Sequence, residues 1–340
     1  MANPVLVEVL RGDVVESRHR GSIVVIDHAG RKMLALGEAS APVYPRSAIK
    51  LLQAIPLVTT GAIAEFGFGQ RELALACSSH NGEPRHTELA NAMLMRTGLD
   101  VSALECGAHV PSLDKAAREL LLTGARPSPL HNNCSGKHAG MLAVARHMGE
   151  PTQGYVRPGH PVQLRIASVL EELTGCQPSA DVCAVDGCSV PTWALPLDSW
   201  ALAFARIADQ AAGGSELLAG GRKLMAACMA EPAYVAGERR FCTDVMEAMA
   251  GSAFVKTGAE GVFCAALPGK GIGIALKIDD GATRASEAAM AGVLAALVDG
   301  HAEMLTRWSR KPVRNVAGAQ VGEVRLRADL ARAFQILKVH

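Results

Sequence analysis

Two short polar motifs in this chain of 340 residues have the residue types of a serine–lysine catalytic site. Ser47 and Lys50 are three positions apart, and residues three apart on a helix share a face, so the amine can reach the hydroxyl. An amine that removes the hydroxyl proton makes serine a nucleophile that can be acylated. Late in the chain, Lys256-Thr257-Gly258 adds a second lysine, followed by a glycine that lets a substrate approach the backbone.

The residues around Ser47 predict that a helix begins there. Pro45 lies just ahead, where proline is tolerated at a helix start. The apolar residues that follow have the spacing of one helix face, namely Ala48, Leu51, Leu52 and Ile55. Lys50 would be buried beside this face, and burial disfavours the charged amine. We therefore expect its pKa to be lowered toward the range of a useful base.

Both motifs are short enough to occur by chance, and a lysine at the end of a strand is usually a surface cation. Their joint presence favours acyl transfer, because Ser-x-x-Lys and Lys-Thr-Gly recur together in serine β-lactamases and penicillin-binding proteins. The Ser-Asp-Asn element of those enzymes is missing from this chain. Another segment must therefore supply its serine.

A polar run at residues 77–86 contains a candidate for that serine. The run reads Cys-Ser-Ser-His-Asn-Gly-Glu-Pro-Arg-His and follows an apolar helical segment at 73–76. It is equally consistent with a helix end, a turn at Asn81-Gly82 and a helix restart at Pro84. In the functional interpretation, Ser79 supplies the missing hydroxyl.

Two cysteine-containing segments are candidates for a metal site or a reactive thiolate. Cys134 lies at a predicted helix N-terminus with Lys137 three residues later, and both the helix dipole and the ammonium lower the pKa of a thiol. Asp186 and Cys188 lie in a turn after a short strand. Spacing alone does not join Cys134 to Cys188, so two inert buried thiols are the alternative.

Length and composition predict a large globular protein that binds a small molecule. With 49% hydrophobic residues and a net charge of +1, the chain can bury a large core, and nothing favours nucleic acid or an anionic membrane as partner. No signal peptide or long uncharged apolar stretch is visible, so we expect a soluble cytoplasmic protein. Nine cysteines, an odd number, fit free thiols in a reducing compartment.

Strand patterns near both ends of the chain and helical patterns between them predict an α+β fold. The strand patterns are at 5–10, 22–27, 32–36, 182–185, 253–256, 262–267 and 272–278, and the helical ones at 47–55, 84–98, 112 onward, 135–149, 161–175, 197–250 and 286–298. We expect an antiparallel sheet lobe from about 1–60 and 250–340, with packed helices, and an inserted helical lobe at about 61–249. Together they would form a single catalytic unit over residues 1–340, with a cleft at the seam.

Five ordered motifs resemble the L-asparaginase II family, which has a serine-β-lactamase-like fold and is distinct from the threonine-nucleophile asparaginases. They are YPRSAIK at 44–50, SSHNGEP at 78–84, HNNCSGKH at 131–138, DGC at 186–188 and KTGAEG at 256–261. The resemblance extends from residue 7 to residue 284. One departure is Asn81, at a position where we expect serine in much of the family, and it affects only the fine details of substrate affinity.

The resemblance implies hydrolysis of L-asparagine to L-aspartate and ammonia through a serine acyl-enzyme. By motif, Ser47 and Lys50 would form one Ser-Lys pair, and Ser79 and Lys256 the other. The sequence does not indicate which lysine serves which proton transfer.

The resemblance also implies a metal site made by Cys134, Lys137 and Cys188, with Asp186 close by. Lysine binds a metal only as the neutral amine, so metal affinity should fall at lower pH. Zn²⁺ fits thiolate and amine ligands best. Because Ser47 already supplies the nucleophile, the metal would shape the pocket or hold the substrate. No organic cofactor is expected.

A free amino acid carries an ammonium and a carboxylate, so the pocket needs a fixed anion and fixed cations or amide donors. Candidates for the ammonium are Glu83, Asp186 and Glu260, and candidates for the carboxylate are Arg46, His80 and Asn132. Asn81, Thr257 and Gly258 are further candidate substrate-binding residues.

Two other functions fit the same residues. One is a glutaminase or another acyl hydrolase on this scaffold, such as a β-lactam-binding peptidase. The other is a non-catalytic metal or amino-acid sensor. In each case the expected partner is a small molecule, with a homodimer as the default assembly.

Overall fold

The chain divides, in this computed structural model, into two units, and the structure describes residues 2–211, 213 and 215–339. The sheet unit comprises Met1–Ala48, Leu195–Gln210 and Val255–His340. The helical unit comprises Ile49–Ala194 and Ala211–Phe254. Ser47 and Lys256 therefore belong to the sheet unit, whereas Lys50 and Ser79 belong to the helical unit.

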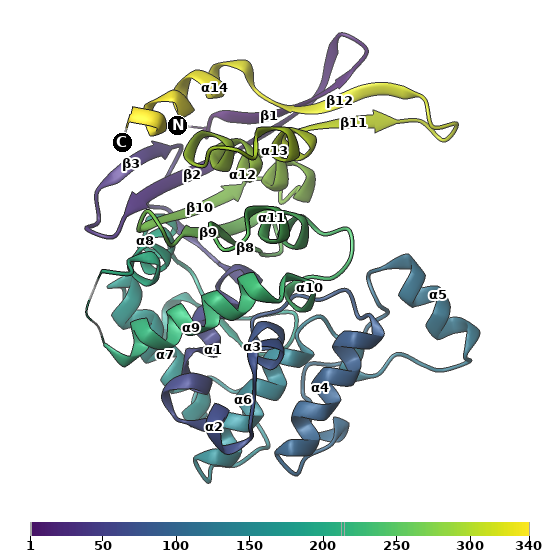
Figure 1. The fold of residues 1–340 in the computed structure, drawn as a ribbon, viewed down its shortest axis with the longest axis vertical. Helices are drawn as coiled ribbons and strands as arrows, with labels where there is room; N and C mark the ends of the chain where they lie inside the picture. The colour runs from purple at the N-terminus through teal and green to yellow at the C-terminus, as the bar shows by residue number, and fades with distance from the viewer. Residues whose placement is uncertain (1, 212, 214, 340) are drawn as a thin grey trace. The chain divides into compact units, whose positions relative to one another are not determined.

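An eight-stranded sheet with the order β11-β12-β1-β2-β10-β9-β8 forms the sheet unit, and β3 also pairs with β2. Its strands are β1 (Val5–Arg11), β2 (Val14–Asp27), β3 (Lys32–Leu36), β8 (Phe254–Thr257), β9 (Val262–Leu267), β10 (Ile272–Ile278), β11 (Arg310–Arg314) and β12 (Gln320–Leu326). Strands from the two ends of the chain, purple and yellow in Figure 1, lie side by side because β1 pairs antiparallel with both β2 and β12.

Burial along the strands explains why helices cover this sheet. The first half of β2 is mostly exposed, whereas its second half, from Gly21 to Ile26, and the whole of β9 are buried. A strand buried at every position needs cover on both faces. The helices α8 (Leu197–Ala208) and α12 (Thr283–Leu297) pack on the central strands, α8 against β2 and β10, and α12 against β1, β9 and β10.

The remaining elements of the sheet unit are short or lie toward its C-terminal end. They are β4 (Pro42–Val43), η1 (Arg46–Ile49), which crosses into the helical unit, β7 (Leu195–Pro196), α13 (Ala302–Ser309), α14 (Ala328–Gln335) and η5 (Ile336–Val339). The pair β4 and β7 matters for the site, because β4 ends just before Ser47. Trp200 of α8 is buried and donates a hydrogen bond from Nε1 to Val43 O at 3.1 Å, which fixes this segment further.

The helical unit is built around α1, whose residues 50–57 are all buried. Helices α3, α6, α7 and α9 pack against it, and α5 projects at the edge of the unit in Figure 1. Its helices are α1 (Lys50–Thr59), α2 (Ala62–Glu65), α3 (Gln70–Ala76), α4 (Pro84–Arg96), α5 (Asp114–Leu122), α6 (Ser135–His147), α7 (Pro161–Thr174), α9 (Glu216–Ala230), α10 (Pro232–Val235) and α11 (Phe241–Met249). Its other elements are η2 (Val101–Ala103), η3 (Pro129–His131), η4 (Ala180–Val182), β5 (Cys183–Val185) and β6 (Pro191–Trp193).

The predicted fold class is confirmed: a mixed architecture with an antiparallel sheet built from both ends of the chain and packed helices. Three details differ from the sequence-based expectation. The turn at Ser47 is a 3₁₀ helix, and the α-helix begins at Lys50. The lobe bounds differ at two places: residues 195–210 belong to the sheet unit because α8 packs on the sheet, and residues 49–60 belong to the helical unit because α1 packs against its helices. Strands β11 and β12 were not expected, since β11 is polar and largely exposed and has no apolar alternation.

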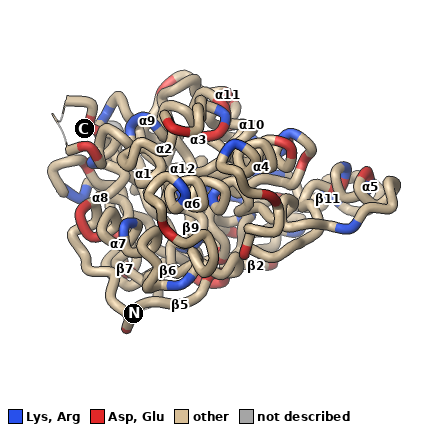
Figure 2. The backbone as a smooth tube through the Cα atoms, turned by 90° about the horizontal axis from the view of Figure 1, so that it is seen from below, with Lys and Arg blue, Asp and Glu red and all other residues tan. Residues whose placement is uncertain are grey.

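Basic and acidic residues are interspersed along the backbone in Figure 2, in keeping with the net charge of +1. Within the described part of the chain, none of the helices has the length and apolar character needed to cross a membrane.

Trp200→Phe should lower the free energy of unfolding by about 1–3 kcal/mol, because it removes a buried hydrogen bond and part of a filled volume. Urea denaturation measures the change. Trp308→Phe, at a half-buried residue of α13, is the matched control and should change stability less. Equal effects of the two substitutions would contradict the role given to the bond between Trp200 and Val43.

Candidate active site

A buried lysine and a serine meet in the helical unit. Lys50, the first residue of α1, has no exposed surface, and its Nζ lies 3.0 Å from Ser79 Oγ. The same amine donates to two backbone carbonyls, Ser78 O and Asn133 O. Lysine is rarely buried unless its polar head is satisfied, and here three oxygen atoms surround it.

This arrangement fixes which atom a neutral Lys50 would act on. A neutral amine has two N–H groups and one lone pair, and the two backbone carbonyls can only accept hydrogen bonds. They therefore hold the two N–H groups, which leaves the lone pair facing the Ser79 hydroxyl, the one neighbour of the three that can donate. The geometry suits proton transfer between Ser79 Oγ and Lys50 Nζ.

Ser47 lies in η1 of the sheet unit and is half-buried. The residue before it, Arg46, has a backbone φ of 50°, in the left-handed region that costs free energy for a residue other than glycine. Such strain persists only where the surroundings impose it, and it is concentrated at functional sites.

The Lys256-Thr257-Gly258 motif approaches the turn that carries Ser47 closely. A Cβ atom at Gly258 would lie 2.8 Å from Pro45 O and 3.1 Å from Ala48 N, so only glycine fits there. Lys256 is 1% exposed, and its Nζ donates to Thr257 O at 2.8 Å. The structure thus brings together two motifs that are far apart in the sequence.

The two Ser-Lys pairs predicted from the motifs, Ser47 with Lys50 and Ser79 with Lys256, each join one residue of the sheet unit to one of the helical unit. They stay predictions. The structure adds a contact between Lys50 and Ser79, which takes one residue from each predicted pair. The sequence did not predict the role of Asn133, whose backbone carbonyl accepts a hydrogen bond from Lys50, because every residue has such a carbonyl.

His80 is held as a neutral ring beside this pair. Its Nδ1 accepts a hydrogen bond from Gly82 N at 3.1 Å, so Nε2 carries the proton and donates to Ser135 Oγ at 2.9 Å. Burial, followed by the neighbouring charges of His86 and Lys50, holds the pKa of His80 well below its ordinary value. The rings of His80 and His86 are stacked, with centroids 4.7 Å apart.

Several predicted substrate-binding side chains use their hydrogen bonds inside the protein. Asn132 donates to Cys106 O and Gly107 O, and its Oδ1 accepts from Cys134 N. Glu83 Oε1 accepts from Glu238 N at 2.8 Å. These contacts hold loops together, and the substrate-binding role of Asn132 and Glu83 stays a prediction.

A cavity of about 460 Å³ opens in the sheet unit next to two of the predicted substrate-binding residues. Its charged lining residues are Glu38, Arg46, Glu260, Lys277 and Asp279. Glu260, like Arg46, has a positive φ, of 57°. Charges of both signs suit a zwitterion, and the volume lies within the range of small-molecule pockets. Thr257 is the last residue of β8, and Gly258 follows it, two residues before Glu260.

The predicted metal ligands lie together in the helical unit. Cys134 caps α6, Lys137 is in its first turn, and Cys188 is in the turn between β5 and β6. Lys137 Nζ lies 3.1 Å from Cys188 Sγ, and Cys188 Sγ lies 3.6 Å from an Asp186 oxygen. All three predicted ligands are buried.

The two thiols have opposite pKa shifts. A hydrogen bond from Cys134 and the charge of Lys137 lower the pKa of Cys188 to about 5, although burial opposes this. The same hydrogen bond and burial raise the pKa of Cys134 to about 12. Burial lowers the pKa of Lys137, but the charges of Cys188, Cys134 and Asp186 outweigh it and raise the value. A thiolate–ammonium pair results, with a protonated thiol beside it.

The donor set of these three residues fits a zinc ion in its chemistry, since it offers two sulfur atoms and one amine, with Cys188 in contact with both Lys137 and Cys134. Among the residues that the structure describes, no group of three or more His, Cys, Asp or Glu side chains could hold a metal ion. A metal here would therefore depend on Lys137. Cys106, which the sequence did not single out, lies close enough to Cys134 and Cys188 to be affected by their charges, and burial raises its pKa to about 12.

Acidification should destabilise the fold through the buried histidines. Both His80 and His86 have pKa values below their ordinary one, chiefly through burial, so below about pH 6.5 the unfolded chain binds protons that the folded chain does not. The free energy of unfolding should therefore fall as the pH drops below about 7.5, and it should keep falling until the pH reaches the lowered pKa values of the folded protein. Urea denaturation should show a smaller fall for His80→Gln than for wild type. A wild-type slope in His80→Gln would refute this assignment.

The family model of L-asparaginase II matches residues 7–326. No curated protein matches the sequence significantly. A solved structure described as "Crystal structure of Mglu in its native form in the presence of 4.3M NaCl" is 13% identical, with a TM-score of 0.37, and the match covers 81% of this chain and 60% of that one. The family match extends over nearly the whole chain and includes all five motifs; the chain therefore belongs to the L-asparaginase II family, a family of asparaginase-type amidohydrolases.

Proposed function

We propose that this protein is an L-asparaginase that hydrolyses L-asparagine to L-aspartate and ammonia through an acyl-enzyme on Ser47. Membership of the L-asparaginase II family supports an amidohydrolase. The observation that supports a serine–lysine mechanism is the buried contact between Lys50 Nζ and Ser79 Oγ. The choice of Ser47 as the nucleophile rests on its position three residues before Lys50 in the chain.

In the acylation step, a neutral lysine accepts the Ser47 hydroxyl proton while Ser47 Oγ forms a bond to the carbon of the substrate's side-chain amide. Backbone N–H groups stabilise the oxyanion that develops. The C–N bond then breaks as the amide nitrogen receives a proton, and ammonia leaves. Ser79 can pass that proton, because its hydroxyl faces the Lys50 amine and both donates and accepts.

In the deacylation step, water attacks the ester carbon and the same groups act in reverse order. The proton of water passes to a lysine, the bond between the carbon and Ser47 Oγ breaks, and Ser47 Oγ regains a proton. The products are L-aspartate and the free enzyme. Lys256, whose Nζ donates to Thr257 O, is the second lysine available for these transfers.

We further propose that Cys134, Lys137 and Cys188 hold a Zn²⁺ ion. When bound, zinc supplies a positive charge and a Lewis-acidic position that suit anchoring a carboxylate. Lys137 must lose its proton to become a ligand, and the adjacent Cys188 already has the lowered pKa of a thiolate ligand. A homodimer and a cytoplasmic location stay predictions.

Ser47→Ala, Lys50→Met and Ser79→Ala should each lower kcat for L-asparagine by about 1,000-fold, because each removes a member of one proton-transfer set. Lys32→Met, at a half-exposed lysine paired with Asp198 in the sheet unit, is the control and should keep wild-type kcat. Ammonia release measures activity, and mass spectrometry of acid-quenched protein should map the acyl group to Ser47.

An acyl group on Ser79 instead would overturn the assignment of the nucleophile. Faster hydrolysis of L-glutamine or of a β-lactam than of L-asparagine would favour the other acyl hydrolases. Unaltered ligand binding and no ammonia release from any variant or from wild type would favour a sensor.

Purified protein should contain about one zinc ion per chain by elemental analysis, and Cys188→Ser and Lys137→Met should lose it. Cys183→Ser, in the strand before the same turn, keeps all three donors and should retain the metal. Zinc-free wild-type protein after aerobic and anaerobic purification alike would contradict the proposed site.

A further inference from the structure

A second segment of the helical unit holds the backbone of Ser79 from both sides. Ser79 N donates to Val235 O at 2.9 Å, and Ser79 O accepts from Arg240 Nη1 at 3.4 Å. Both partners lie in residues 235–240, which comprise the last residue of α10 and the connection to α11. The amide and the carbonyl of Ser79 are therefore fixed by one short stretch of chain more than 150 residues away in the sequence.

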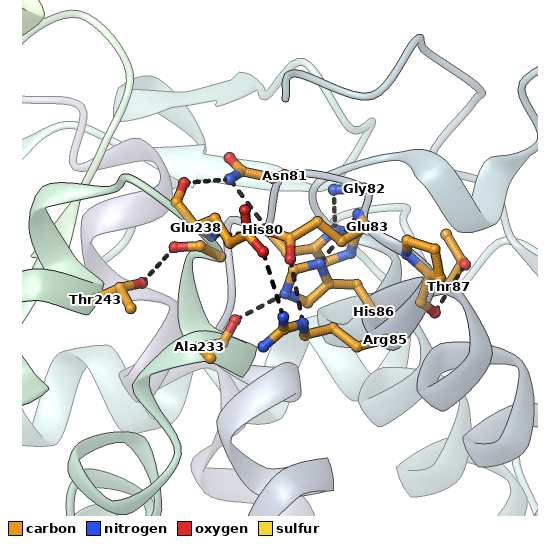
Figure 3. Close-up of polar contacts among 12 residues, drawn as sticks. His80, Asn81, Gly82, Glu83, Arg85, His86, Thr87, Ala233, Glu238 and Thr243 are labelled. Carbon is orange, nitrogen blue, oxygen red and sulfur yellow. Dashed lines mark hydrogen bonds and ion pairs between the residues drawn. The ribbon is translucent and has the colours of Figure 1, made fainter. Parts of the chain in front are cut away.

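Asn81 joins this segment to the loop that follows Ser79. Its Oδ1 accepts from Arg240 Nη1 at 2.9 Å, so one arginine nitrogen contacts Ser79 O and Asn81 Oδ1. Its Nδ2 donates to Glu238 O at 2.9 Å and also lies within hydrogen-bond distance of Glu83 (Figure 3). Asn81 is 3% exposed, and its oxygen and its nitrogen each have two partners, since Oδ1 also accepts from Ser112 Oγ. The side chain acts as a link between two parts of the protein.

The backbone of residues 235–240 contains two positive φ angles, which glycine adopts readily but which cost free energy at Arg239. Gly237 has a φ of 99° and Arg239 a φ of 57°, so two of three consecutive residues spanning 237–239 are in the left-handed region. A Cβ atom at Gly237 would lie 2.2 Å from Glu83 Oε1 and 2.8 Å from Asn81 Nδ2. Thr243 Oγ1 donates to Gly237 O at 2.7 Å and holds the turn from the other side (Figure 3). Strained backbone persists where surrounding contacts over-determine it, as they do here.

The contacts to the Ser79 backbone affect the geometry of the pair formed by Ser79 Oγ and Lys50 Nζ. Lys50 Nζ is fixed by α1 and by the carbonyls of Ser78 and Asn133. The position of Ser79 Oγ relative to that amine depends on the Ser79 backbone, and so on the residues that bind its amide and carbonyl. A displacement of about 1 Å at a reacting group can lower the rate by about 100-fold.

We propose that Arg240, with Asn81, is a positioning residue that sets the place of Ser79 Oγ against Lys50 Nζ; this inference rests on the proposed function. Arg240 contacts neither amine nor hydroxyl, and it acts through the Ser79 carbonyl and the Asn81 amide. The same contacts give Asn81 a place in the protein scaffold, and its substrate-binding role stays a prediction.

The test compares Arg240→Met and Arg240→Lys in the full-length protein. Arg240→Met removes both hydrogen bonds and should lower kcat for L-asparagine by about 30-fold, with KM changed less than about 3-fold, because binding groups stay in place while the proton-transfer geometry changes. Arg240→Lys keeps a cation that can reach one of the two oxygens, so it should recover part of the lost kcat.

The control is Arg71→Met. Arg71 pairs with Glu231 at 3.4 Å and lies over the Tyr234 ring, so it also holds the chain near residues 231–235, but it does not contact Ser79 or Asn81. It should keep wild-type kcat. Asn81→Ala combined with Arg240→Met should be no slower than Arg240→Met alone, because both substitutions break one link.

Hydrogen exchange gives a readout that needs no activity. Amides of residues 78–83 should exchange faster in Arg240→Met than in wild type or Arg71→Met, with thermal unfolding otherwise alike. Equal kcat in Arg240→Met and Arg71→Met, a change in KM alone, or unchanged exchange at 78–83 would overturn the inference. If wild type releases no ammonia from L-asparagine, the proposed function fails, and the exchange experiment still decides whether Arg240 holds the Ser79 loop.

Discussion

Burying a lysine amine is costly unless oxygen or sulfur atoms surround it, and three such amines organise this protein. Lys50, Lys137 and Lys256 are each at most 3% exposed. Lys50 is satisfied by two carbonyls and a hydroxyl, Lys137 by a thiolate, and Lys256 by the carbonyl of the next residue. The different partners give each lysine a different chemistry.

The partners of Lys50 leave it suited to exchanging a proton with a hydroxyl. Backbone carbonyls do not gain or lose protons under these conditions. Among these three partners of Lys50 Nζ, Ser79 Oγ is therefore the one that can exchange a proton with the amine while its hydrogen bonds to the two carbonyls stay in place. Lys137 contacts the Cys188 thiolate, whose negative charge balances the positive charge of the amine. This favours an ion pair, or a metal ion bound by both side chains. One helix, α6, carries Lys137 in its first turn and begins at Ser135, two residues after Asn133, so it links the two environments.

The sheet unit holds the two other predicted catalytic residues, Ser47 and Lys256. Paired strands and two packed helices make a rigid support for the end of β8. At that end, Gly258 lies against the turn that carries Ser47, and the strained Arg46 and Glu260 face the same charged cavity. Strain at two positions of one cavity indicates that the loops are held by the scaffold, as a binding site requires.

Residue types and local spacing could be read from the amino-acid sequence alone. Ser47 lies three residues before Lys50, Cys134 lies three residues before Lys137, and strand patterns occur at both ends of the chain. Helix and strand patterns depend on neighbouring residues and on the period of apolar positions, and both can be read from a single sequence. The sequence also indicated the family, because the five motifs occur in a fixed order along the chain, and the family model confirms this. The polar edge strand β11 escaped prediction, because its residues have no apolar alternation and its place is set by pairing with β12.

The hydrogen-bond partners of each polar group became clear only in the folded protein. Asn81, Asn132 and Glu83 look alike as free polar side chains in a motif, yet their hydrogen bonds go to Arg240, Cys106 and Glu238. The contact between Lys50 and Ser79, and the hold of Arg240 on Ser79, join residues far apart in the chain. These contacts depend on how the helices pack and on which backbone carbonyls remain available as acceptors. The spacing of residues along the sequence predicts neither.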